Sequence, residues 1–548
     1  MARDATADWS ALGENYFRKW PAYRMMTWGD DVSVEASIVA VGACGGALAM
    51  VRDKEPGKIV RMRGSVAAMD DIRLYSAAGR PLARIRPRGD GRPIALGWSE
   101  SEELWVVYDT GHVDIFDVLG NERDKGISLL PALTGDSVVK AVVGQTGMAA
   151  LVRSSDGRFG LFVVSDMDSP SAEEVGDTGL VGSPTCMAIL EAEFTETGRP
   201  EVLLATSDCS IVVVAPSGGG ASDSYVGEDQ GLADGGLLDD AVVKMCVAPH
   251  GRYLACFCET GQLVVVGTNF QQRLLSFNTK APDLPAQMAW CRDDAVVLSW
   301  HGKAVLVVGP YGDWLKYNYE EPLVLVQEVD CVRMISDTEH LVLQRVPAFT
   351  ADIRRIGSIA PSATLVDAKD SYDEGDARAD DAIRGLKEDE TVMDAVYDCL
   401  LAAAVEWDLD AQKELLRAAS FGKHFDPDAE CVDEAGEDVA IHRSFVDTCK
   451  KLRVLNTLRE GDAGMPLTSE QYDALTPAVV IERLMKRHQH GLALRVCKYL
   501  GVDNDAVLVH WACAKIRASP DVADEELRDL VRKRLRGVGS VSYADIAA

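Results

Sequence analysis

The chain has 548 residues, which is more than one ordinary domain needs. Its 47% hydrophobic and 26% charged residues are typical of globular proteins and exclude extended disorder for most of the chain. With 56 basic and 86 acidic residues the formal charge is −30. Such a charge argues against general binding of nucleic acid and against unaided adhesion to anionic lipid.

The start of the chain, from Met1 to Glu14, is charged and lacks the apolar segment of a secretory signal, so we expect a cytoplasmic protein. The longest uncharged stretch lies between Glu35 and Arg52 and is shorter than the roughly 20 residues of a membrane span. It therefore predicts a buried sheet. The 13 cysteines have no framework spacing, and we expect them to be reduced thiols.

Composition changes near residue 365, because 37 of the 47 glycines and 17 of the 21 prolines precede that position. The earlier part repeats one pattern, in which two apolar runs flank a short turn of glycine or polar residues. Such turns accept positive φ, so each repeat predicts a β-hairpin. The paired runs are Leu104–Tyr108 with Val113–Val118, Ala149–Val152 with Phe159–Val164, Val202–Ala205 with Ile211–Val214, Tyr253–Phe257 with Leu263–Val266, and Val296–Trp300 with Ala304–Val308.

The hairpin turns recur with a regular spacing. They lie at positions 111, 157, 209, 261 and 302, which are 46, 52, 52 and 41 residues apart. A period of about 40–50 residues with four short strands per unit is typical of propeller blades. We predict a seven-bladed β-propeller over residues 1–365, with six or eight blades as alternatives. A β-sandwich would not need this regular period.

Residues 366–390 are rich in Asp and Glu and predict an acidic linker or first helix, and a calcium loop is disfavoured because the ligand spacing is absent. Residues 391–548 then show helical periodicity and predict the N-terminal part of an α-solenoid.

Four local signals set the expected helix ends in this region. Gly422 is predicted as the C′ residue of a helix over Leu409–Phe421. Thr476-Pro477 and Ser519-Pro520 are each predicted as an N-cap followed by proline at the first helical position. Gly491 is predicted to separate two helices.

Searches for catalytic motifs are negative: no phosphate loop, HExxH or G-x-S-x-G occurs. The Gly218–Gly220 run is interpreted as a loop. Cys256 and Cys258 are two residues apart on a predicted strand, so buried thiols are favoured over zinc ligands. We predict no catalytic, cofactor-binding or metal-binding residue, and no residue is assigned to a partner.

Three histidines and two neighbouring cations are the other candidates for chemistry. His488 and His490 would diverge by about 200° on one helix and could not readily share a metal. Together with Lys486 and Arg487 they are interpreted as a solvated basic helix surface. His510 is interpreted as a packed helix residue rather than a ligand or base.

Many short runs, in order and spread over almost the whole chain, carry a more specific signal. With them the sequence resembles the vacuolar protein sorting-associated protein 16 family, whose members are core subunits of the HOPS and CORVET endosomal tethering complexes. The runs are Tyr16–Trp20, Met26–Trp28, Ala43–Asp53, Ile94–Ser99, Val247–Ala255, Asp294–Trp300, Gly309–Trp314, Leu343–Pro347, Arg355–Ser358, Ala360–Ala363, Gln412–Lys423, Leu452–Asn456, His510–Cys513 and Val541–Ala547.

The resemblance implies a non-enzymatic scaffold on late endosome, lysosome or vacuole membranes that supports SNARE-mediated fusion. Implied partners are vacuolar protein sorting-associated proteins 11 and 18, with indirect Rab GTPase and SNARE association. The sequence departs from the family at Asp426–His442, which we interpret as a surface insertion, and at Ala548, beyond which the family's solenoid continues. We therefore expect the surface for the Sec1/Munc18-type protein 33 to be missing.

Two other functions would account for some of these sequence features. A scaffold of another propeller–solenoid assembly, such as a vesicle coat, would have the same architecture but would not explain the ordered runs. A propeller enzyme would need carboxylates, histidines or a metal converging on a central channel, and no spacing indicates one.

Overall fold

The computed structural model describes residues 6–29, 32–54, 71–87, 91–123, 126–130, 135–176, 178, 180, 182–218, 224–232, 236–425, 430–432, 438–535 and 546. The chain divides into two compact units. The sheet unit is Asp8–Arg345, and the helical unit is Val346–Ala548 together with Met1–Ala7.

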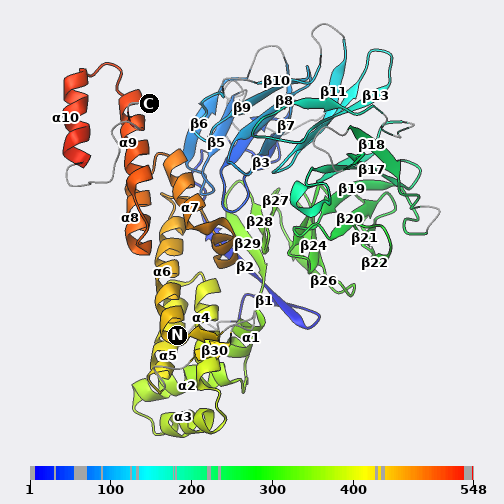
Figure 1. Ribbon diagram of the computed structural model, residues 1–548. Coiled ribbons are helices and arrows are strands. Elements are labelled where there is room, and N and C mark those ends of the chain that lie inside the picture. Colours follow the sequence, from blue (N-terminus) through cyan, green and yellow to red (C-terminus); the bar gives the residue numbers. More distant parts are fainter. Residues whose placement is uncertain are drawn as a thin grey trace. The chain divides into compact units, whose positions relative to one another are not determined.

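In its described residues the sheet unit contains seven antiparallel sheets, and many of their strands are labelled in Figure 1. Six of them have four strands each, taken consecutively from the chain. These six are β3 (Ser37–Val41), β4 (Leu48–Arg52), β5 (Ile72–Tyr75) and β6 (Pro81–Ile85); β7 (Pro93–Trp98), β8 (Leu104–Tyr108), β9 (His112–Phe116) and β10 (Ile127–Ser128); β11 (Ser137–Val143), β12 (Met148–Arg153), β13 (Phe159–Val164) and β14 (Ala172–Glu174); β15 (Cys186–Leu190), β16 (Glu201–Ala205), β17 (Ile211–Pro216) and β18 (Tyr225–Asp229); β19 (Val242–Val247), β20 (Tyr253–Cys258), β21 (Gln262–Gly267) and β22 (Arg273–Asn278); and β23 (Gln287–Cys291), β24 (Ala295–Trp300), β25 (Ala304–Val308) and β26 (Trp314–Asn318).

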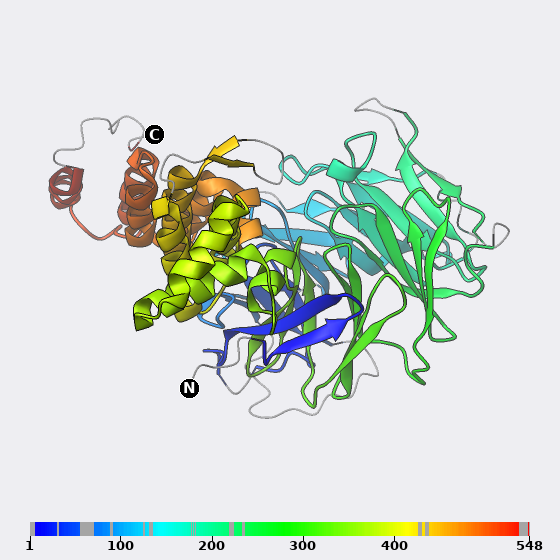
Figure 2. The same ribbon diagram turned by 90° about the horizontal axis from the view of Figure 1, so that it is seen from below.

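The seventh sheet joins the two ends of the sheet unit. Its strands are, in order, β1 (Trp9–Leu12), β2 (Asn15–Tyr23), β29 (His340–Arg345), β28 (Cys331–Ile335) and β27 (Val324–Gln327). β2 pairs with β29 along most of its length, with Phe17 opposite Arg345 and Tyr23 opposite His340. Figure 2 shows the dark-blue N-terminal strands beside the green strands of this sheet. The ends of the sheet unit are therefore held together by backbone hydrogen bonds.

All five predicted hairpins are present, and each turn has the expected backbone. Gly111, Gly157, Gly261 and Gly302 have φ between +63° and +88°. Cys209 takes the same left-handed region at the remaining turn, with φ of +60°. A residue with a Cβ is disfavoured there, so glycine is the usual choice. The regular spacing of the turns thus reflects one hairpin for each of five successive sheets.

The core of the sheet unit is divided into clusters that lie between neighbouring sheets. Ala49 and Leu74 of the first sheet pack with Val106 of the second, and the following pairs of sheets have clusters of the same kind. One further cluster combines Val324 and Ile335 of the seventh sheet with residues of the first. Each sheet is therefore buried on two faces, which explains why inner strands such as β8 and β25 are buried at every position rather than at alternate ones.

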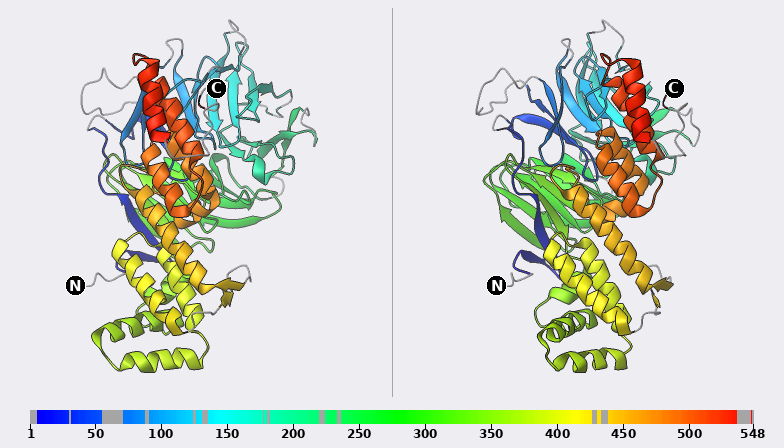
Figure 3. Two further views of the ribbon diagram at one scale, coloured as in Figure 1. Left: turned by 60° about the vertical axis from the view of Figure 1, so that its left-hand side comes forward. Right: turned by 90° about the vertical axis from the view of Figure 1, so that its left-hand side faces the viewer.

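The helical unit contains ten α-helices and one short hairpin among its described residues. Figure 3 shows the helices, from yellow-green to red, following one another so that neighbours in sequence pack together. They are α1 (Ala348–Arg354), α2 (Pro361–Glu374), α3 (Arg378–Glu388), α4 (Val392–Val405), α5 (Leu409–Gly422), α6 (Ile441–Arg459), α7 (Ser469–Lys486), α8 (His490–Leu500), α9 (Asp505–Arg517) and α10 (Asp524–Leu535), with β30 (Glu430–Val432) and β31 (Asp438–Ala440) between α5 and α6. The first helix begins before the boundary predicted near residue 365.

Gly422 is the last residue of α5, and its predicted role as a C′ glycine is wrong. Lys423 follows in a right-handed helical conformation, so no left-handed cap forms. A Cβ on Gly422 would lie 2.5 Å from Val396 Cγ2 and 3.0 Å from Leu365 Cδ2. Glycine is therefore required here because α5 approaches α4 and α2 closely.

Two other predicted helix ends also differ. The break predicted at Gly491 is wrong, because α7 ends at Lys486 and Gly491 is the second residue of α8. The Ser519-Pro520 cap is wrong, because α10 begins at Asp524.

The Thr476-Pro477 prediction is met in part. Thr476 is non-helical, with φ of +63°, and Pro477 opens the second half of α7. The cap that begins α7 is Thr468, whose hydroxyl accepts from the Gln471 N–H in a capping box.

Much of the predicted insertion Asp426–His442 lies outside the described residues. Of the Gly218–Gly220 run, the second and third glycines lie outside them as well.

Candidate functional site

A buried ion pair connects the seventh sheet to the first. Arg333 on β28 and Glu328, just after β27, are both 1% exposed, and their nearest N···O distance is 2.5 Å. The other carboxylate oxygen of Glu328 accepts a 2.7 Å hydrogen bond from the Cys44 N–H. The Arg333 guanidinium also donates to the Gly42 carbonyl oxygen at 2.5 Å. Both charges therefore contact the turn between β3 and β4.

That turn can form only because of its glycines. Cys44 and Gly45 both have positive φ, at +51° and +67°. A Cβ on Gly46 would lie 2.6 Å from the Gly42 carbonyl carbon, a distance that real Cβ atoms do not reach. The run Ala43–Asp53, which carries part of the family resemblance, thus begins in a turn shaped to receive the ion pair.

His340, at the start of β29, is a second buried polar group in the same region. It is 0% exposed, and its Nδ1 lies 2.9 Å from the Ala77 carbonyl oxygen. A carbonyl only accepts, so Nδ1 carries the proton of this hydrogen bond. Burial, and then the positive charge of Arg333, lowers the pKa of His340 to about 3. Sequence reasoning missed these three residues, although Arg333 was visible as a charge inside the apolar strand Cys331–Ile335.

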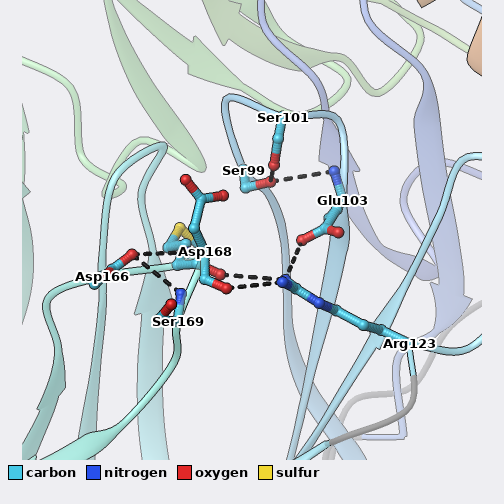
Figure 4. A network of polar contacts seen from close by, with 8 residues as sticks. Ser99, Ser101, Glu103, Arg123, Asp166, Asp168 and Ser169 are labelled. Atoms are coloured by element: carbon cyan, nitrogen blue, oxygen red, sulfur yellow. Dashed lines mark hydrogen bonds and ion pairs between the residues drawn. The ribbon is translucent and has the colours of Figure 1, made fainter.

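A third polar network connects the second and third sheets (Figure 4). Arg123 pairs with Glu103 at 2.9 Å and donates to the Asp168 carbonyl oxygen at 2.7 Å. The loop that contains Asp168 is held by the Asp166 carboxylate, which accepts hydrogen bonds from the backbone N–H groups of Asp168 and Ser169. The network contains no activated nucleophile. Its geometry fixes one loop against the neighbouring sheet.

Cys256 and Cys258 are buried on β20, as expected. Both pack in the cluster between the fourth and fifth sheets, whereas Phe257 between them packs on the opposite face. Burial raises the pKa of Cys258 to about 12 and the pKa of Cys256 well above its ordinary value. Thiols of this kind stay protonated at neutral pH and are poor nucleophiles and poor metal ligands.

The structure brings His488 and His490, which were expected to diverge, together with His510. His488 lies in the turn before α8 with φ of +55°, so the helical divergence expected for it and His490 does not apply. His490 Nε2 lies 2.8 Å from His510 Nδ1, and the His488 ring stacks 5.6 Å from that of His490. Burial, followed by the neighbouring His510 and His488, lowers the pKa of His490 to about 4.

The predicted solvated basic surface is therefore wrong at two of its four positions. Arg487 and His490 are 5% and 8% exposed, while His488 is exposed. The histidine contact joins α8 to α9 as a neutral hydrogen bond, in which one ring donates and the other accepts.

No set of three His, Cys, Asp or Glu side chains in the described part of the chain is arranged to hold a metal ion. The acidic stretch 366–390 lies mainly on α2 and α3. Among the described residues, every helix is too short or too polar to cross a membrane.

The ion pair of Arg333 and Glu328 joins two sheets, and the contact of His490 with His510 joins two helices. Successive four-stranded antiparallel sheets followed by packed helices define a protein with a sheet unit and a helical unit. Residues 5–432 match the family model "Vps16, N-terminal region". The chain belongs to the Vps16 family.

Curated relatives match nearly the whole chain. Protein VACUOLELESS1 of Arabidopsis thaliana is 34% identical over 99% of this chain and 61% of its own length. The vacuolar protein sorting-associated protein 16 homologs of Dictyostelium discoideum and Drosophila melanogaster are 30% and 28% identical over 99% of this chain. The chain thus spans about three fifths of the length of these relatives.

Among solved structures, the β-propeller domain of Myceliophteria thermophila Cps50 is 11% identical, with a TM-score of 0.39 over 57% of this chain and 97% of its own.

Proposed function

We propose that this chain is a non-enzymatic scaffold subunit of a HOPS/CORVET-type tethering complex on endosomal, lysosomal or vacuolar membranes. The observation that carries the proposal is the family match, with relatives named for vacuolar protein sorting along 99% of the chain. A tether acts by raising the local concentration of weakly interacting membrane partners, which requires binding surfaces and no chemistry. The buried polar networks, all engaged in holding the fold, are consistent with that role.

The architecture we propose for it is a seven-bladed propeller, formed by the sheet unit Asp8–Arg345, followed by an α-solenoid that begins with α1, before the boundary predicted at residue 365. Seven sheets in succession support the blade count. Closure into one ring is supported by the core cluster between the seventh and first sheets and by the contacts of Glu328 and Arg333 with the turn at Cys44.

The partners we propose are vacuolar protein sorting-associated proteins 11 and 18, with Rab GTPases and SNAREs associated indirectly and the membrane contacted only peripherally. The acidic chain, with its charge of −30, supports recruitment by protein partners rather than by direct attraction to anionic lipid.

Affinity purification of the tagged 548-residue chain from its own cells, followed by mass spectrometry, tests the proposal. We expect proteins 11 and 18 to co-elute, and a purification from cells expressing the tag alone is the control. Co-elution of the Sec1/Munc18-type protein 33 would place a contact for it within these residues. Recovery of coat subunits, or of no tether subunit, would refute the tethering role and leave the fold unaffected.

A further inference from the structure

A groove opens between the fifth and sixth sheets, at the ends of their outer strands. Its volume is about 520 Å³. One wall is the end of β22 with the loop over residues 279–283, and the other is formed by β25 and β26. β22 and β26 are labelled in the right-hand half of Figure 1. Pockets that bind small ligands or peptide side chains typically measure about 300–1,000 Å³. We call this feature the Trp314 groove.

The floor of the Trp314 groove is apolar and partly aromatic. Leu306 on β25 is paired with Lys316 on β26, and Trp314 lies two residues before Lys316, so these side chains share one face of the sheet. Phe277 and Trp300 complete the floor. Trp314 is 57% exposed, which is unusual for so large an apolar side chain. Tryptophan is one of the residue types enriched among those that dominate binding energy at interfaces.

The walls of the groove are held by hydrogen bonds. The Trp300 indole N–H donates to the Asp283 carbonyl oxygen at 2.8 Å. At the other end of the loop, the Lys280 N–H donates to the Asn278 side chain at 2.8 Å, and the Thr279 hydroxyl donates to the Gly261 carbonyl oxygen at 2.7 Å. The loop is thus fixed before any ligand arrives, which lowers the ordering cost of binding.

The charge around the groove is opposite to that of the protein. The residues lining it include Lys280, Lys303 and Lys316 but only one acid, Asp283. Lys303 is paired with Asp283. In the part of the chain that the structure describes, Lys280 and Lys316 have no ion-pair partner. Two uncompensated cations beside an apolar floor, on a chain of charge −30, make a site that complements an acidic ligand with an apolar anchor.

We propose that the Trp314 groove binds a short extended peptide in which an aromatic or leucine side chain is flanked by Asp or Glu residues. The apolar anchor would pack against Trp314 and Phe277, and the flanking carboxylates would pair with Lys280 and Lys316. The aromatic floor favours a peptide over a phosphorylated headgroup, which would use the lysines but leave Trp314 without a contact. The groove lies wholly within the sheet unit, so peptide binding there is independent of membership of a tethering complex.

Fluorescence anisotropy with the full chain tests this. The probe is a fluorescein-labelled pool of ten-residue peptides with a central leucine, phenylalanine or tryptophan flanked by aspartate and glutamate. One matched pool has lysine and arginine flanks, and another has serine in place of the anchor. We expect binding of the first pool only. We also expect it to weaken as salt rises from about 50 to 300 mM, because the exposed charges are screened.

Variants assign the binding to the groove. W314A should weaken binding of the acidic anchored pool at least about tenfold, and K280E/K316E should do the same through charge reversal. Y311A and K498E/K515E are the controls: Tyr311 is 89% exposed on the neighbouring turn, and Lys498 and Lys515 are exposed on α8 and α9. Both should bind the pool within about twofold of wild type, and circular dichroism checks that all four variants fold.

Three results would overturn the proposal. The acidic anchored pool could fail to bind at millimolar concentration, or W314A could bind it as well as wild type does. Alternatively, vesicles containing phosphatidylserine and phosphoinositide could bind through Lys280 and Lys316 while the peptide pool does not, which would make the groove a lipid site.

Discussion

Acidification should destabilise the sheet unit through His340. The folded state holds this imidazole neutral, with a pKa of about 3, whereas an unfolded histidine titrates near 6.5. Above pH 6.5 the side chain is neutral in both states and contributes nothing to pH dependence. Below that value the unfolded state binds the proton and the folded state does not. Stability therefore falls as pH decreases from about 6.5 towards 3.

The size of the effect follows from the two pKa values. Linkage between about 6.5 and about 3 gives a loss of about 2 kcal/mol at pH 5 and about 3 kcal/mol at pH 4, relative to pH 7.5. Such a loss is a large share of the roughly 5–15 kcal/mol that stabilises a typical domain. Hydration of the protonated ring in the folded state cannot offset this loss of stability, because His340 is 0% exposed and contacts the Ala77 carbonyl oxygen.

The assay compares wild type with H340Q, which keeps an N–H donor for that carbonyl but does not titrate. Urea unfolding is followed by tryptophan fluorescence, because eight of the ten tryptophans lie in the sheet unit. The difference between the two proteins cancels other groups that titrate in this range, including His490. H340Q should lose about 2 kcal/mol less than wild type between pH 7.5 and pH 5. Equal losses in the two proteins would refute the reasoning.

Three further predictions use thermal or urea unfolding. R333M should lower the free energy of unfolding by about 3–5 kcal/mol, because Glu328 keeps a buried charge without its partner. The double variant E328Q/R333M should recover part of that loss, and no recovery would contradict the argument. G422A should destabilise the protein by about 1–3 kcal/mol, because its Cβ would collide with α4. G385A on α3 should stabilise it slightly, because a Cβ there meets nothing within 4 Å. A change of the same sign in both variants would refute the packing argument. T468A should cost about 1 kcal/mol by removing the α7 cap, and T468S should restore it.

Local pattern was enough to predict the elements and the change from strands to helices. The hairpin turns were predictable because one residue of each tight turn must accept positive φ, which glycine does at Gly111 and Gly261. α4 was predictable because its apolar residues recur on one face. In both cases the controlling interaction is within a few residues along the chain.

What failed depends on contacts that are distant in sequence. Gly422 has the sequence signature of a cap, but its small size is required by Leu365 and Val396, which belong to other helices. Arg333 and the turn at Gly42 lie 291 residues apart, so no local pattern could pair them. The histidine contact was missed because the end of α7 was placed too late, and a helical angle was then applied to His488, which is outside any helix.

The position of the family resemblance within the fold has a consequence for where partners bind. The run beginning at Ala43 forms the turn that receives Glu328 and Arg333, and Gly46 in it is fixed by backbone contact. A run of this kind is constrained by folding, so it identifies the architecture without identifying any partner surface. Partner contacts have to be sought among exposed side chains that the fold itself does not need. Trp314 meets that condition, because it is more than half exposed at the edge of its sheet, and substituting it tests binding with little effect on folding.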